Sequence, residues 1–245
     1  MMLSAPLDRV LCLLVIVFCS IHGGCYNAAY KHLNKGVELH KAGELESAIE
    51  EYTKAIGIDP EYALSYFNRA YAERELGDLE SAVADYTKAI EIDPEFANAY
   101  LSRADLFSSR GDYPEAIRDF TRVIELDSLR TDAFLGCGIV HMESGKYSEA
   151  FSDYARAIEI DPHFAAAFIN RVDLKIRTRD LEGAVSDYSQ AICIAPDSAI
   201  AYFNRGTIRE RMKDYAAAIQ DYERAASLSS ELAKKAQERI KFCRR

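Results

Sequence analysis

The sequence contains no tryptophan, and among its 245 residues proline and glycine occur only 6 and 12 times. Aromatic bulk comes instead from 15 Tyr and 11 Phe. A hydrophobic fraction of 49% is ordinary for a folded protein and argues against a disordered chain, which lacks the apolar surface for a core. No run of basic residues occurs, and the net charge is −9. Since nucleic-acid binders present clustered Lys and Arg, we expect no nucleic acid among the partners.

Motifs of catalytic and metal sites are also missing. The chain has no Cys-x-x-Cys pair, no His-Glu-x-x-His, no Gly-x-Ser-x-Gly and no glycine-rich phosphate loop. We therefore predict no catalytic residue, no metal ion, no cofactor and no enzyme activity. Cys137, Cys193 and Cys243 each stand alone within a helical pattern, which is typical of a cysteine that acts as a small core side chain.

The N-terminal segment differs from the rest. Residues 10–21 form an uncharged apolar run that is too short for a membrane-spanning helix, which needs about 20 residues. With Arg9 before it and two glycines after it, the run resembles the apolar core of a signal peptide. We predict a cleaved signal peptide over residues 1–24, a short segment over 25–28, and an extracytoplasmic mature protein that is periplasmic, secreted or held in the cell envelope. Lipidation of Cys25 would anchor it to a membrane; a free N-terminus and an uncleaved, buried or membrane-anchoring helix are the alternatives.

The remainder of the chain repeats with a period of 34 residues. Each unit carries an alanine, an aromatic residue four positions later, and a small or β-branched residue three positions further on. The alanines are Ala48, Ala82, Ala116, Ala150, Ala184 and Ala218, and the aromatics are Tyr52, Tyr86, Phe120, Tyr154, Tyr188 and Tyr222. This spacing puts the three residues on one apolar helix face. Four units then end before a proline, which stops the helix because the residue before proline disfavours the α conformation.

This pattern, with a first helix ahead of each such helix, resembles the tetratricopeptide repeat. The family signature combines W-x2-L-G-x2-Y with a later A-x3-F and a proline. The second half matches all six units except for the prolines missing at Ser128 and Ser230, while the first half matches loosely because Tyr, Phe or His replaces tryptophan. The resemblance implies an all-α fold, a right-handed superhelical solenoid of six helix pairs over residues 29–232. We expect one more helix, over residues 230–245, to cap the last pair.

In proteins that this sequence resembles, the first helices of the pairs line a concave groove that takes a peptide or a helix. The resemblance therefore implies a scaffold or adaptor that binds a protein or peptide segment there. The predicted groove residues are Leu33, Val37, Leu64, Phe67, Tyr71, Arg74, Leu101, Asp105, Leu135, Ile139, Ile169 and Phe203. For the apolar members, packing between neighbouring repeats is the alternative. For the whole chain, the alternatives are a structural homo-oligomer of the cell envelope and an enzyme with a cryptic site.

The repeated asparagines and aspartates are predicted to have structural roles and not binding roles. The carboxylate clamp of chaperone-binding members is not predicted, because only one of its Lys, Asn and Arg positions is matched, by Asn68. The repeated asparagines are instead predicted to form hydrogen bonds between helices; they are Asn34, Asn68, Asn170 and Asn204. The repeated aspartates are predicted to lie on a solvated helix face; they are Asp85, Asp119, Asp153, Asp187 and Asp221.

The intact mass of the protein purified from its native source tests the predicted signal peptide. We expect a mass that lacks residues 1–24, with an added lipid if Cys25 is lipidated. A mass that retains Met1 would contradict the signal peptide, and an unmodified Cys25 would contradict lipidation.

Overall fold

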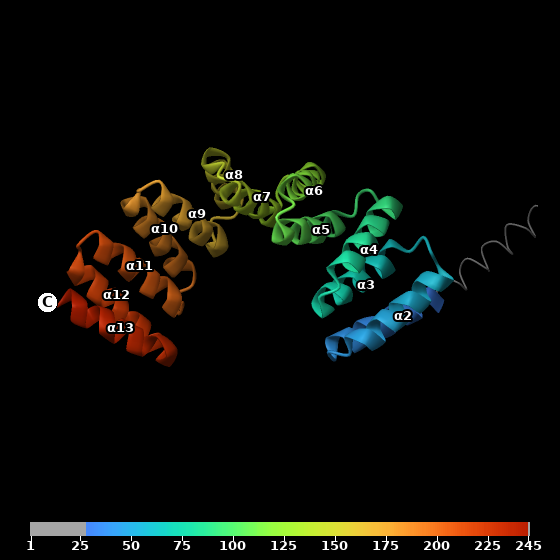
Figure 1. Cartoon of the computed structure of the whole chain (residues 1–245), viewed down its shortest axis with the longest axis horizontal. Coiled ribbons are helices and arrows are strands. Elements are labelled where there is room, and N and C mark those ends of the chain that lie inside the picture. The colour runs from blue at the N-terminus through green and yellow to red at the C-terminus, as the bar shows by residue number, and fades with distance from the viewer. Residues whose placement is uncertain (1–27, 245) are drawn as a thin grey trace, which may run out of the picture. The chain divides into compact units, whose positions relative to one another are not determined.

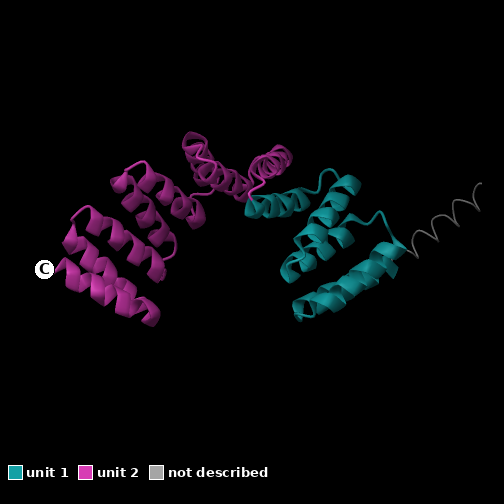
Figure 2. Ribbon diagram, in the orientation of Figure 1, with its two compact units in different colours: residues 1–110 teal, residues 111–245 magenta. Residues whose placement is uncertain are grey.

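Residues 28–244 are described by a computed structural model, and within them all regular structure is helical (Figure 1). The predicted signal peptide and Cys25 lie outside these residues. The chain divides into two compact units, residues 1–110 and residues 111–245 (Figure 2).

The helices of unit 1 pair in the predicted order. They span residues 28–41, Leu45–Ile58 (α2), Ala63–Leu76 (α3), Leu79–Ile92 (α4) and Ala97–Arg110 (α5). Within this unit, α2 packs against α3, α3 against α4 and α4 against α5.

Unit 2 continues the same alternation. Its helices are Tyr113–Leu126 (α6), Thr131–Glu143 (α7), Tyr147–Ile160 (α8), Ala165–Arg177 (α9), Leu181–Ile194 (α10), Ala199–Arg211 (α11), Tyr215–Leu228 (α12) and Ser230–Cys243 (α13). Each packs on its successor, and α7 also contacts α9 while α11 contacts α13. The first helices of two successive pairs, α7 and α9, therefore lie next to each other, and α13 takes the equivalent place beside α11.

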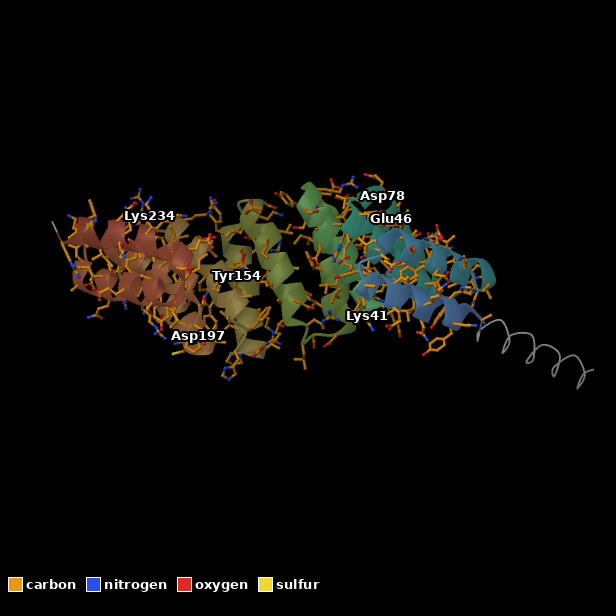
Figure 3. All side chains as sticks on the ribbon, turned by 90° about the horizontal axis from the view of Figure 1, so that it is seen from below. Lys41, Glu46, Asp78, Tyr154, Asp197 and Lys234 are labelled. Atoms are coloured by element: carbon orange, nitrogen blue, oxygen red, sulfur yellow. The ribbon has the colours of Figure 1, made fainter. Side chains whose placement is uncertain are left out.

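The repeated alanines and aromatics form the core, as the spacing predicts. All six alanines have no exposed surface, and the six aromatics are at most 6% exposed. A small residue on the first helix of a pair makes room for the ring: a Cβ atom on Gly138 would lie 2.5 Å from the Tyr154 ring, and one on Gly36 equally close to Tyr52. Figure 3 shows Tyr154 among the helices, whereas the exposed Asp197 and Lys234 lie at the margins.

The turns between pairs and within pairs use different chemistry. Between pairs, the Asp of Asp-Pro folds back on the chain; Asp59 Oδ1, for example, accepts a hydrogen bond from the Glu61 N–H at 3.1 Å. This Asx turn ends the second helix. Within a pair, four glycines take the left-handed conformation, with φ between 74° and 86°. In the last two pairs Arg179 and Lys213 take it instead, with φ of 66° and 65°, at a cost of about 1 kcal/mol each relative to glycine.

The prediction of a solvated aspartate face is wrong. Asp85, Asp119, Asp187 and Asp221 are 8% exposed or less. Arg69, Arg171 and Arg205 on the first helices bind Asp85, Asp187 and Asp221 through two hydrogen bonds each, at 2.6–3.0 Å. The aspartate directly precedes the core aromatic, so it faces the partner helix and not water. Removing one partner of such a buried pair typically costs about 3–5 kcal/mol.

The same slot is filled differently in the first and fourth pairs. In the first pair Glu51 accepts hydrogen bonds from Lys54, His32 and Lys35, which hold its pKa down at about 2. In the fourth pair Cys137 stands where the other pairs carry Arg or Lys, and His141, one turn later, binds Asp153 at 2.7 Å. Burial raises the pKa of the Cys137 thiol to about 12. The core interpretation is therefore right for Cys137, whereas Cys193 is exposed.

These arginines also link one pair to the preceding one. Arg69 donates to the Thr53 hydroxyl at 3.0 Å and Arg205 to the Ser189 hydroxyl at 2.9 Å, in each case on the second helix of the pair before. One side chain thus bonds three helices. At the equivalent point before Arg171 the residue is Ala155, which has no hydroxyl to offer.

Helix α13 covers the end of the last pair. Its Ala236 and Ile240 are buried against Ala218 and Tyr222 of α12. Glu210, at the end of α11 and 8% exposed, accepts hydrogen bonds from the Tyr222 hydroxyl and from Arg239 Nε of α13, each at 2.9 Å. A buried carboxylate therefore ties the capping helix to the pair that it covers.

Replacing Ala82 by leucine should destabilise the fold, because Ala82 has no exposed surface and added volume must strain the helix contact. Such overpacking costs about 1–3 kcal/mol, and thermal or urea unfolding measures it. The matched control is Ala84→Leu on the exposed side of the same helix. Equal unfolding midpoints for the two variants would contradict the assignment of Ala82 to the buried face of the helix and Ala84 to the exposed face.

Candidate functional site

In unit 1, the predicted groove residues lie on the first-helix side of the pairs, but not all of them are accessible. Leu33 is only 2% exposed and belongs to the core around Tyr52, with Val37 packed against that core. Leu64 on α3 is 38% exposed, and Asp105 on α5 is also exposed. Leu33 is therefore a core residue and not part of an accessible groove surface.

Phe67 takes part in packing between neighbouring repeats. Its ring centroid lies 5.6 Å from that of Tyr86 in its own pair and 4.9 Å from that of Phe96, which precedes the next first helix. It is half-buried against two core clusters. Phe67 therefore packs between neighbouring repeats, which was the alternative interpretation of the apolar groove residues. It lies beneath the accessible surface and supports it.

Tyr71, one turn after Phe67, lies between two cationic or ionisable groups. The Arg74 guanidinium carbon is 4.4 Å from the Tyr71 ring centroid, and the His40 ring of the preceding first helix is 5.4 Å from it. His40 Nε2 in turn lies 3.0 Å from Glu75 Oε2. These contacts fix the orientation of the Tyr71 ring, and they join the first helices of two successive pairs.

A hollow of about 340 Å³ lies beside the start of α3. It is lined by Glu61, Tyr62, Ala63, Leu64, Ile92, Asp93 and Phe96. Leu64 borders it and is seven residues before Tyr71, so the two side chains lie on the same side of α3. The exposed part of this surface therefore combines an apolar end with an aromatic and cationic end.

In unit 2, the predicted groove residues again divide between packing and surface. Leu135 and Ile139 pack against the core of α8 and α9, and the Phe203 ring lies 5.3 Å from the Tyr222 ring. Ile169 is 39% exposed on α9. Ile200 on α11, which was not among the predicted site residues, is 62% exposed; it heads the same helix face as Phe203.

Two of the repeated asparagines bond within their own helix, whereas Asn204 on α11 bonds Tyr188 on α10. Asn68 Nδ2 donates to the Leu64 carbonyl at 2.8 Å and Asn170 Nδ2 to the Ala166 carbonyl at 2.9 Å, both within their own helix. The prediction of hydrogen bonds between helices is therefore wrong for these two residues. A helical asparagine can satisfy its amide on the carbonyl one turn back, and both residues do so here.

Glu73 is the unusual carboxyl group of unit 1. Its side chain is 12% exposed, and one of its oxygens is buried without a hydrogen-bond partner among the described residues. Burial raises the pKa of Glu73 to about 7, the Asp85 carboxylate adds to this, and the Arg69 guanidinium opposes it. The Arg69–Asp85 pair leaves Glu73 in a charged neighbourhood without a bond of its own, since Arg69 Nε is 3.8 Å away.

Residues 28–244 contain neither a candidate metal site nor a candidate membrane span. No three His, Cys, Asp or Glu side chains in this range lie where they could hold a metal ion together. Nor does the range contain a helix with the length and apolar character needed to cross a membrane.

Helix pairs with this spacing, core and turn chemistry define a protein of helical repeats, and the family comparison is specific. Models of the TPR repeat match residues 36–72 and 70–109, and a tetratricopeptide repeat model matches residues 101–163 and 169–233. The chain belongs to the tetratricopeptide repeat family. This fold is typically a scaffold for interactions between proteins and not a catalytic one. No curated protein matches the chain significantly in sequence.

Solved structures share the fold. A tetratricopeptide repeat protein of Parabacteroides merdae is 24% identical, with a TM-score of 0.64 over 89% of this chain and 84% of that one. YrrB, described as a TPR protein with an unusual peptide-binding site, is 25% identical, with a TM-score of 0.57 over 76% and 97%. PilF of Pseudomonas aeruginosa is 19% identical, with a TM-score of 0.72 over 88% and 99%.

The raised pKa of Glu73 predicts how stability depends on pH. The folded state holds a proton on Glu73 up to about pH 7, whereas the unfolded chain releases it near pH 4.5. The folded state therefore binds more protons in this window, and stability falls as pH rises through it.

Glu73→Gln should remove this dependence. We expect the variant to be more stable than the wild type at pH 8, by about 1 kcal/mol or more, with little difference at pH 4.5. Urea unfolding across the range measures it, with the exposed Glu46→Gln as the control. Parallel stability curves for the wild type and Glu73→Gln would contradict the assignment.

Proposed function

We propose that the protein is a scaffold that binds a peptide segment of a partner on the first-helix side of unit 1. The observation that carries this proposal is the Tyr71 ring, held between His40 and Arg74 with the exposed Leu64 on the same side of α3. An oriented aromatic side chain beside an arginine is the kind of group that dominates binding energies at protein interfaces.

The chemistry of this surface favours a segment with one apolar and one acidic or carbonyl group. Leu64 and the neighbouring hollow offer apolar contact, while Arg74 offers N–H donors next to the Tyr71 ring. Phe67 supports the surface from beneath through its contacts with Tyr86 and Phe96. The peptide-binding site described for YrrB, at 25% identity, supports peptide binding as a use of this fold. We further propose that binding takes place outside the cytoplasm, on the strength of the apolar run over residues 10–21.

Peptides selected from a random library on the full mature protein test the proposal. Tyr71→Ala and Leu64→Ala should each lower the affinity for the selected peptides about tenfold. Neither should lower the unfolding temperature, because both side chains are partly exposed. Phe67→Ser should lower the unfolding temperature, because it removes the contacts with Tyr86 and Phe96.

The exposed Ile200 of unit 2 supplies the matched control, as Ile200→Ala removes comparable apolar surface elsewhere. Isothermal titration calorimetry gives the affinities. Peptides that bind Tyr71→Ala and Leu64→Ala as well as the wild type would exclude this surface.

A further inference from the structure

Two turns of unit 2 carry side chains that the fold does not require. Arg179 and Lys213 occupy equivalent positions 34 residues apart, and both have the left-handed φ that glycine supplies in the other four pairs. Each makes the same backbone bond that glycine makes there: Arg179 N to Ile176 O at 3.1 Å and Lys213 N to Glu210 O at 2.9 Å. Glycine would serve the turn better in both places, so the reason for a cation lies outside the turn.

A second cation accompanies each of them. Arg177 ends α9 and Arg211 ends α11, two residues before Arg179 and Lys213 respectively. All four side chains are exposed, and none has an ion-pair or hydrogen-bond partner within residues 28–244. The helix dipole accounts for a cation at a helix C-terminus, but not for one in the turn beyond it.

An apolar hollow opens beside the first of these turns. It has a volume of about 230 Å³ and is lined by Tyr147, Ser148, Phe151, Leu174, Lys175, Thr178 and Asp180. Phe151 is 47% exposed and Tyr147 39%, on the same side of α8. Thr178, in the lining, stands between Arg177 and Arg179 in the chain, so these two cations adjoin the hollow.

This hollow has an equivalent one repeat earlier. That one is lined by Tyr113, Pro114, Ile117, His141, Ser144 and Lys146. There Ile117 stands in place of Phe151, and the turn contains Gly145 in place of Arg179. The other pairs carry Val or Ile where Phe151 stands. The larger aromatic Phe151 thus accompanies the turn cation Arg179, whereas Val185 takes the equivalent position before the Lys213 turn.

We propose that this surface, the hollow beside α8 with the cationic turns after α9 and α11, binds an acidic protein segment that carries a bulky apolar residue. The apolar side chain enters the hollow against Tyr147 and Phe151. Carboxylates on either side of it bind Arg177 and Arg179, and those further along bind Arg211 and Lys213. The site is separate from the α3 surface of unit 1 and does not depend on it.

Charge favours discrete carboxylates over a polyanion. Asp180 and Asp214 directly follow Arg179 and Lys213, and their side chains cap α10 and α12 through bonds to Gly183 N and Ala217 N. The cations are therefore interrupted by fixed negative charge, on a chain of net charge −9. A phosphate backbone or an anionic membrane needs an uninterrupted basic surface, whereas a peptide can place its carboxylates between these aspartates.

The test uses a short fluorescein-labelled peptide with one phenylalanine flanked by glutamates, and the same peptide with glutamine for glutamate. Arg179→Gly and Lys213→Gly together restore the residue that the other turns use, so the unfolding temperature should stay or rise. We expect this double variant to bind the glutamate peptide about tenfold more weakly, and Phe151→Val to weaken it several-fold. The glutamine peptide should bind weakly to all forms. Fluorescence anisotropy with the full chain measures the affinities.

Lys234→Ala with Lys235→Ala is the matched control, because it removes two exposed positive charges elsewhere in unit 2. Wild-type affinity in this control supports the site, while an equal loss shows mere long-range attraction and overturns it. Unchanged binding in the glycine double variant, or a lower unfolding temperature for it, also overturns the proposal. So does tighter binding of phosphatidylglycerol vesicles or of a single-stranded oligonucleotide than of the glutamate peptide.

Discussion

The contact between an alanine-lined helix face and the aromatic ring beside it governs this molecule. Every pair places an alanine with no exposed surface one turn before a ring that is almost completely buried. Helices can approach this closely only where one side is small, and the ring then fills the space that remains. Because the contact recurs every 34 residues, it determines the environment of the other positions in each repeat. It decides which residues face the partner helix, which lie in turns and which are exposed to solvent.

One result of that phase is a line of charges inside the protein. The residue before each ring must face the first helix, and in this chain it is a carboxylate. A buried carboxylate needs a partner, and arginine can meet it with two bonds while it reaches a hydroxyl of the preceding pair. The first-helix surface is thereby held in place from behind. Its outward side chains, such as Leu64 and Tyr71, can then differ from pair to pair without loss of the fold.

The sequence was informative wherever a periodic pattern reported on packing. The alanine and aromatic spacing was sufficient for the helix pairs and their order. It could not separate Leu33, which is core, from Leu64, which is surface, because both lie on the same kind of helix face. The aspartates were misjudged because charge alone suggests solvent, and only the position next to the ring reveals burial. The raised pKa of Glu73 had no signal in the sequence, since it depends first on how deeply the carboxyl group is buried and then on the nearby Asp85 carboxylate.

Helix α7 differs from the first helices of the other pairs in ways that affect where the protein unfolds first. It contains Gly136 and Gly138, each lying against a ring, and each glycine lowers helix stability by about 1 kcal/mol relative to alanine. It also has Cys137 where the other pairs hold an arginine or a lysine. The stability of a repeat protein depends on contacts between adjacent repeats, so unfolding begins at the least stable helix. When a bound partner pulls on the chain, or a protease samples its fluctuations, α7 is where the helical array should give way first.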